Sequence, residues 1–166
     1  MTRTVWSARV LWGALLGSGG LLLTAMMAEH FWGLAPCPLC LWQRAGHLLA
    51  LVSFLWLRYP SRLCALPGIF GTGLSALVGT YHLGSERGWW AAPGGCTGAP
   101  DLSGMSPEGA LELMMRTIPA RCDEVVWSLA GLSMAGWNAA ISGTLLALWV
   151  GLWAVGRAAP LNRSDH

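Results

Sequence analysis

Four long apolar segments run through this sequence, and they limit its possible folds more than any other feature. A helix that crosses a bilayer needs about 20 consecutive apolar residues. Only 11% of the 166 residues are charged, against about 25% in an ordinary soluble domain. A chain this short cannot bury four such helices in protein, so lipid must cover them. The sequence therefore predicts a single all-α membrane domain over residues 1–166, a bundle of four transmembrane helices at about 10–28, 41–57, 65–83 and 137–155.

The first apolar segment has an alternative interpretation, a cleaved signal peptide. Arg3 and Arg9 would suit the basic start of such a peptide. However, the apolar stretch is longer than the roughly 7–15 residues usual in signal peptides, and no clear small-residue cleavage site follows it. We therefore expect this segment to remain as the first transmembrane helix.

Arginine placement predicts how the helices cross the membrane, because short cytoplasmic loops carry an excess of basic residues. The chain has no lysine, and arginine pairs stand before the first segment, between the second and third, and after the fourth: Arg3, Arg9, Arg58, Arg62, Arg157 and Arg163. With four spans, these three regions share one side of the membrane. Both termini are therefore expected in the cytoplasm, with two outer loops at about 29–38 and 84–136.

The long outer loop contains a segment with the pattern of a short amphipathic helix. Ser106, followed by Pro107 and Glu108, is typical of a helix start. Apolar residues then recur at helical spacing up to an expected end near Pro119: Leu111, Met114, Met115 and Ile118. We expect this face to pack on the domain or to lie at the lipid interface, with docking of a partner as the alternative.

Four of the five cysteines lie on the outer side: Cys37, Cys40, Cys96 and Cys122. Disulfides persist on that side of a membrane and not in the cytosol. The fifth, Cys64, falls on the cytoplasmic side and is expected to be a small buried hydrophobe. The outer cysteines are therefore the candidates for chemistry.

Cys37 and Cys40 form a C-x-x-C motif, which has three possible uses. A zinc site would need two more close ligands, and the other outer cysteines are distant in sequence and have no histidine beside them. A c-type haem site would need histidine directly after the second cysteine, where this chain has Leu41. A redox pair needs only two thiols and a stabilised thiolate. The expected helix start near Cys40, with Arg44 four residues later on the same face, favours a redox pair with the thiolate on Cys40 and no metal.

Cys96 and Cys122 are 26 positions apart in the long loop, and their spacing fits two interpretations. A structural disulfide that staples the loop would contribute on the order of 3 kcal/mol. A shuttle disulfide would instead accept electrons from a partner and pass them on. Glycines near Cys96 at positions 94, 95 and 98 would give a shuttle its mobility. Spacing alone favours neither interpretation.

Three stretches combine these residues in a specific order. They are residues 36–44 (PCPLCLWQR), residues 81–86 (YHLGSE) followed by Gly88-Trp89-Trp90, and residues 122–124 (CDE) followed by Gly131-Leu132-Ser133-Met134 and Trp137-Asn138. Together with the four spans, they resemble the bacterial disulfide bond formation protein B (DsbB) family of inner-membrane thiol oxidases. The first stretch looks like that family's C-x-L-C-x-x-[QE]-R signature. One departure is Ala135, where the family usually has proline before the last helix.

The resemblance implies a role for each cysteine of the two pairs. Cys37 and Cys40 match the membrane-proximal redox pair, with Cys40 nearest a quinone. Cys96 matches the cysteine that a periplasmic DsbA-like thiol oxidase attacks, and Cys122 is its loop partner. These four residues are therefore the expected catalytic residues.

The resemblance also implies a quinone cofactor, ubiquinone or menaquinone. Arg44 matches the residue that contacts the quinone, and His82 lies in the stretch that borders the quinone site. The implied function is a thiol oxidase that reoxidises the DsbA-like partner and passes the electrons to membrane quinone.

Two other functions remain open at this point. One is a structural or transport bundle whose disulfides only brace the outer loops. The other is a similar enzyme that runs in the opposite direction, as a thiol-dependent quinone reductase. A nucleic-acid partner is not expected, because the net charge is only +2 and the sequence has no basic run.

Overall fold

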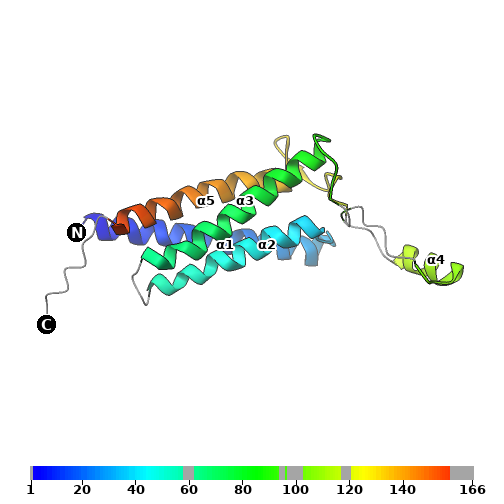
Figure 1. Cartoon of the computed structure of the whole chain (residues 1–166), viewed down its shortest axis with the longest axis horizontal. Helices are drawn as coiled ribbons and strands as arrows, with labels where there is room; N and C mark the ends of the chain where they lie inside the picture. The colour runs from blue at the N-terminus through cyan, green and yellow to red at the C-terminus, as the bar shows by residue number, and fades with distance from the viewer. Residues whose placement is uncertain (1, 58–61, 94–95, 97–102, 117–120, 158–166) are drawn as a thin grey trace.

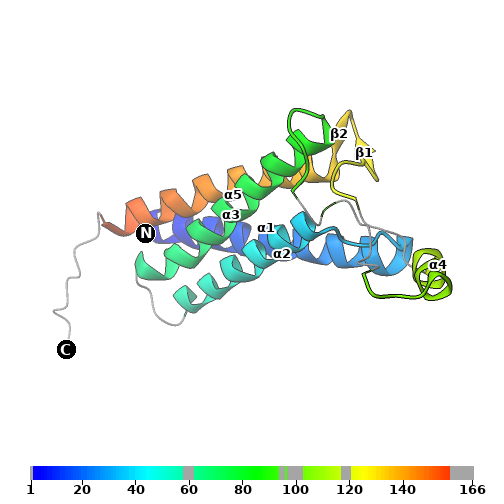
Figure 2. The ribbon, with the colours of Figure 1, turned by 45° about the vertical axis from the view of Figure 1, so that its right-hand side comes forward.

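Four long helices form one bundle in the computed structural model, which describes residues 2–57, 62–93, 96, 103–116 and 121–157. They are α1 (Thr2–Trp32), α2 (Pro38–Leu51), α3 (Leu66–Glu86) and α5 (Met134–Arg157), and they lie side by side (Figure 1). Two 3-10 segments, η1 (Val52–Leu57) and η2 (Arg62–Ala65), follow α2 and precede α3. The short helix α4 (Pro107–Arg116) lies beyond the end of the bundle where α2 begins and α3 ends (Figure 2).

The surface of the bundle is apolar and its interior is partly polar, which is the reverse of a water-soluble domain. Leu77, Leu16 and Phe70 are 65% to 73% exposed on the outside. Ser75 and Ser142, in contrast, are fully buried between the helices. Such an arrangement is stable where lipid surrounds the bundle. Four stretches are long and apolar enough to cross a membrane: Ala8–Trp32, Pro38–Leu57, Arg62–Glu86 and Met134–Val155. The predicted four-helix membrane fold is therefore confirmed.

The second helix begins earlier than the sequence predicted, at Pro38 instead of residue 41. Proline is well suited to the first helical position, because its missing N–H would have no partner there. Cys37 is the N-cap residue, and its Sγ accepts a hydrogen bond from the Cys40 backbone N–H at 3.3 Å. The helix start therefore fixes the position of the first cysteine of the C-x-x-C motif.

Small residues let the helices approach closely, as is typical of packing in lipid. A Cβ atom at Gly46 of α2 would lie 2.6 Å from the carbonyl oxygen of Gly71 on α3, and one at Gly71 would collide with the carbonyl oxygen of Gly46. Between α3 and α5, a Cβ atom at Gly79 would lie 3.2 Å from Ala139. Glycine is thus required where α2 crosses α3.

A two-stranded hairpin that the sequence analysis did not predict precedes α5. Strand β1 (Ser128–Leu129) pairs with β2 (Leu132–Ser133) in antiparallel orientation. The turn consists of Ala130 and Gly131, which have φ angles of 52° and 79°, so both central residues are left-handed as a two-residue hairpin turn requires. An alanine in this conformation is uncommon, which explains why the residue pattern gave no turn signal.

The predicted amphipathic helix is present as α4. The backbone N–H of Gly109 donates to Ser106 Oγ at 3.2 Å, so Ser106 caps the first turn as expected. Leu111 is 61% exposed and does not pack on the bundle. Ile118 and Pro119, where the sequence predicted the end of the helix, lie outside the described residues.

Candidate functional site

The two cysteine pairs that the sequence analysis predicted on the outer side meet at the end of the bundle where α2 begins. Cys96 and Cys122 form a disulfide, and both are buried. Cys37 and Cys40 are thiols whose sulfur atoms are 3.0 Å apart, and Cys37 is only 4% exposed. The four cysteines pack against one another in one cluster, with Leu39 and Val78 around them. Residues far apart in the sequence are thus brought together in one place.

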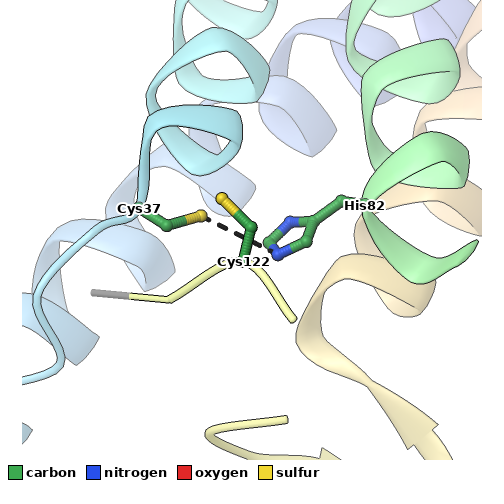
Figure 3. A group of neighbouring side chains, drawn as sticks. All are labelled: Cys37, His82 and Cys122. Carbon is green, nitrogen blue, oxygen red and sulfur yellow. Dashed lines mark hydrogen bonds between the residues drawn. The ribbon is translucent and has the colours of Figure 1, made fainter. Parts of the chain in front are cut away.

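Three of the side chains that the sequence singled out converge in this cluster. Cys37 Sγ, Cys122 Sγ and His82 Nε2 all lie within 4.8 Å of one another (Figure 3). The Cys37 sulfur is 3.8 Å from His82 Nε2. Cys122 is bonded to Cys96 and offers no thiolate to a metal, so this geometry is suited to exchange between sulfur atoms rather than to a metal ion.

Backbone contacts hold the loop disulfide against α3. The N–H of Cys122 donates to the carbonyl oxygen of Cys96 at 3.1 Å. The hydroxyl of Ser85 on α3 donates to the carbonyl oxygen of Cys122 at 3.2 Å. The second cysteine of the loop is therefore positioned by the bundle itself.

The environment of Cys37 favours its thiolate. A hydrogen bond from the Cys40 thiol, helped by the His82 side chain and the Cys40 backbone N–H, holds the pKa of Cys37 well below its usual range despite burial. The sequence analysis placed the stabilised thiolate on Cys40. The structure instead gives Cys37 the donors, because Cys37 is the N-cap residue and lies next to His82.

Arg44 is directed toward α1. Its Nη1 lies 2.5 Å from Oε2 of Glu29, and its Nη2 donates to the carbonyl oxygen of Ala25 at 3.1 Å. The guanidinium is only 19% exposed. Arg44 therefore lies in a fixed position on the wall between α1 and α2, held by an acid to which the sequence analysis gave no role.

His82 is held by polar neighbours on two sides. Its Nδ1 is 3.1 Å from Nε2 of Gln43, and its Nε2 is 3.9 Å from Oε1 of Glu86 one turn later on α3. The other carboxylate oxygen of Glu86 accepts a short hydrogen bond from the hydroxyl of Ser133. His82 therefore connects the cysteine cluster to a carboxylate near the start of α5.

A cavity of about 350 Å³ opens beside this cluster. Four of the six predicted site residues line it: Cys37, Cys40, Arg44 and His82. Most of the wall is apolar and comes from α1, α5 and the long loop, and His47 and Asn138 line it as well. An apolar wall with a few hydrogen-bonding groups is typical of sites that bind small organic molecules.

Sequence reasoning missed several residues of the site. Glu29 and His47 were assigned no role, and Gln43, Glu86 and Asn138 were noted only as parts of motifs. A polar residue inside an otherwise apolar segment is the signal that could have identified His47 and Gln43.

Comparison with known proteins agrees with this geometry. The family model "Disulfide bond formation protein DsbB" matches residues 7–152. A protein from Marinobacter nauticus named "Disulfide bond formation protein B" is 32% identical over 142 residues, which cover 78% of this chain and 81% of that protein. A protein from Pasteurella multocida with the same name is 29% identical over 171 residues, which cover 97% of this chain and 95% of that protein. No solved structure matches the chain.

A third relative, from Stutzerimonas stutzeri, carries the same name and is 29% identical over 82% of this chain and 89% of its own length. The residues that the family model matches include both cysteine pairs and most of the four long helices. This multi-pass membrane protein therefore belongs to the DsbB family of disulfide bond formation proteins.

Proposed function

We propose that this protein is a quinone-dependent thiol oxidase of the bacterial inner membrane, with both termini in the cytoplasm, that reoxidises a periplasmic DsbA-like protein. One observation carries the proposal: the Cys96–Cys122 disulfide lies against the Cys37–Cys40 pair, and that pair lines an apolar cavity. Electrons can thus pass between sulfur atoms and then reach a lipid-soluble acceptor without crossing water.

Electrons enter through the loop disulfide. A thiolate of the partner attacks Cys96, and Cys122 leaves as a thiolate. Cys122 then attacks Cys37 of an oxidised Cys37–Cys40 pair, so Cys40 leaves as a thiolate. The second thiolate of the partner attacks the mixed disulfide, which releases Cys96 and gives the partner its disulfide.

The loop disulfide then re-forms. The thiolate of Cys96 attacks Cys122 of the Cys37–Cys122 bond, and Cys37 leaves as a thiolate. Two electrons have then moved from the partner to Cys37 and Cys40. These steps would leave Cys96 joined to Cys122 and would leave Cys37 and Cys40 reduced.

The cavity residues fit ubiquinone or menaquinone as the acceptor. The reduced Cys37–Cys40 pair would return to a disulfide by giving up two electrons, and a quinone held beside it would supply the acceptor for them, with the two protons of the quinol taken up from water. Arg44 would donate hydrogen bonds to a carbonyl oxygen, which gains negative charge on reduction. The apolar wall would hold the ring and exclude water.

The test is a coupled assay with the purified protein in detergent. Reduced DsbA-like protein and a quinone are added, and quinone reduction is followed by absorbance. We expect turnover in the wild type and in Cys64→Ser, which changes a cysteine outside the cluster. We expect no turnover in Cys40→Ser. If the wild type failed to reduce quinone while its disulfides stayed intact, the disulfides would be bracing elements and the proposal would be wrong.

A further inference from the structure

A chain of buried polar side chains runs from the cysteine cluster into the middle of the bundle. Gln43 of α2 contacts His82 of α3 and also accepts a hydrogen bond from Nδ2 of Asn138 on α5 at 2.7 Å. Oδ1 of Asn138 is 3.1 Å from Nε2 of His47. Ser75 and Ser142 complete the inner end of the chain, with hydroxyl oxygens 3.0 Å and 3.2 Å from the same nitrogen.

The directions of the hydrogen bonds that join Gln43, His82, Asn138 and His47 follow from one backbone carbonyl. The carbonyl oxygen of Leu39 lies 3.2 Å from one end of the Gln43 amide, and only the NH₂ group can donate to it. That NH₂ group is also 3.1 Å from Nδ1 of His82, so Nδ1 must be an acceptor without a proton. Neutral His82 therefore carries its proton on Nε2, the nitrogen that faces the Cys37 sulfur at 3.8 Å.

The same reasoning determines the hydrogen-bond directions at the inner end of this row of polar side chains. The oxygen of the Gln43 amide needs a donor, which is Nδ2 of Asn138, and the second N–H of Asn138 donates to Ser75 Oγ at 3.0 Å. Asn138 Oδ1 then accepts from His47, so His47 also carries its proton on Nε2. Reversing the Gln43 amide would set its oxygen against the Leu39 carbonyl and would leave Asn138 without its acceptor.

We propose that Gln43, held by the Leu39 carbonyl and by Asn138, is a positioning residue that keeps His82 in its Nε2–H form and so directs a hydrogen-bond donor at the Cys37 thiolate. The inference deepens the proposed function and rests on it, because Cys37 leaves as a thiolate when the loop disulfide re-forms. A donor at that sulfur favours departure of Cys37 over its return attack on Cys122. With the proton on Nδ1, the Nε2 lone pair would instead face the sulfur and disfavour the thiolate.

The competing explanation is that the polar chain only joins α2, α3 and α5, since polar groups between helices in lipid stabilise packing. That explanation predicts effects on stability alone. Among the described residues, the titratable groups that contact Cys37 are Cys40 from α2 and His82 from α3, with Glu86 next to His82 on the same helix. Arg44, Arg121 and Glu124 line the same cavity. Changes to Gln43 therefore affect the Cys37 sulfur through His82.

The direct test is the protonation of His82 itself. Protein with ¹⁵N-labelled histidine is reconstituted in liposomes, reduced, and studied by solid-state NMR, and the His82 signals are identified by their loss in His82→Asn. We expect the proton on Nε2 in the wild type. In Gln43→Glu, an acceptor replaces the NH₂ group, so we expect a proton on Nδ1. A wild-type proton on Nδ1, or no change in Gln43→Glu, would overturn the proposal.

The second measurement is the reactivity of Cys37, followed by alkylation of the reduced protein and mass spectrometry. In Gln43→Met, which keeps the volume and loses the donor, the pH for half-maximal alkylation of Cys37 should rise by about one unit, a tenfold change in the thiolate equilibrium. Thr72→Val on α3 is the matched control, because Thr72 is also buried and its hydroxyl donates within its own helix, to the carbonyl oxygen of Gly68. We expect it to leave the alkylation profile unchanged.

These outcomes separate the proposal from the function on which it rests. If Gln43→Glu and Gln43→Met lost thermal stability and kept the wild-type alkylation profile, the row of polar side chains would only stabilise helix packing and the proposal would be wrong. The NMR result does not require oxidase activity. Absence of quinone reduction with the proton on Nε2 would contradict the proposed function and leave the role of Gln43 intact.

Discussion

Arg44 on α2 is tied to Glu29 on α1, with 2.5 Å between Nη1 and Oε2. The pair lies at the cavity that Arg44 helps to line, and the carbonyl oxygen of Ala25 holds the other terminal nitrogen. The planar guanidinium is thereby oriented by two acceptors on one neighbouring helix. Its position in the cavity wall thus depends on Glu29, and the pair gives a direct test of the proposed quinone site.

Quinone turnover should fall in the order wild type, Arg44→Lys, Arg44→Met. Lysine keeps the charge but loses the planar fork, and methionine loses both. Glu29→Ala removes an anchor of Arg44, so we expect roughly a tenfold rise in the quinone concentration needed for half-maximal rate. Steady-state kinetics with varied quinone would measure these effects. Unchanged kinetics in Arg44→Met would mean that Arg44 only joins α2 to α1 through Glu29 and Ala25, and the quinone contact would move to His82.

The pKa of Cys37 predicts how its reactivity depends on pH. An ordinary cysteine has a pKa of about 8.5, and its alkylation slows as the pH falls below that value. Because the Cys40 thiol and His82 lower the pKa of Cys37, its thiolate persists at neutral pH and is lost only as the pH falls through the lowered value. Alkylation of the reduced protein across a pH series would show this. Protein unfolded in denaturing detergent is the control, where the profile should return to that of an ordinary thiol.

Loss of the loop disulfide should stop electron entry and leave the bundle folded. In Cys96→Ser, the partner has no disulfide to attack, while Cys37 and Cys40 keep their places on α2. If the disulfide acted only as a staple, its removal would cost about 3 kcal/mol of stability with activity retained. Circular dichroism on heating and quinone reduction, measured on the same sample, would separate the two roles. A collapsed bundle in Cys96→Ser would favour the staple.

The crossing of α2 and α3 should not tolerate a side chain at Gly71. A Cβ atom there would collide with the backbone of Gly46, so Gly71→Ala should destabilise the bundle by about 1–3 kcal/mol, as overpacking usually does. Gly73→Ala is the matched control on the same helix, because its nearest neighbour would be Leu146 Cδ1 at 3.8 Å. Thermal unfolding in detergent would compare the two. Equal stability of both variants would contradict the close approach.

Single cysteines at exposed positions would test the proposed orientation. Trp89, after α3, is 66% exposed, and Leu63, on η2 at the opposite end of that helix, is 62% exposed. In a background where serine replaces all five native cysteines, a membrane-impermeant thiol reagent added to spheroplasts should label Trp89→Cys and not Leu63→Cys, since the arginine pattern places the second loop in the cytoplasm. The opposite labelling would mean that the protein is inverted.

Much of this architecture was readable from local patterns. Apolar length determined the four helices, and Ser106 with Pro107 indicated the start of α4. The hairpin before α5 was not predicted, because its turn uses Ala130 in a conformation that alanine rarely adopts. The start of α2 was placed three residues late, because an apolar pattern alone does not show that proline can begin a helix before it.

The sequence by itself determined that this chain lies in a membrane, and it indicated the cysteines as the candidates for its chemistry, since both conclusions need only composition, spacing and recognisable motifs. It could not decide which cysteine carries the thiolate, because that depends on donors from other elements: His82 comes from α3, 45 positions from Cys37. It also could not show that Glu29 holds Arg44, or that the Leu39 carbonyl orients Gln43 and through it His82. Hydrogen bonds between helices depend on how the helices pack, and only the tertiary structure decided those.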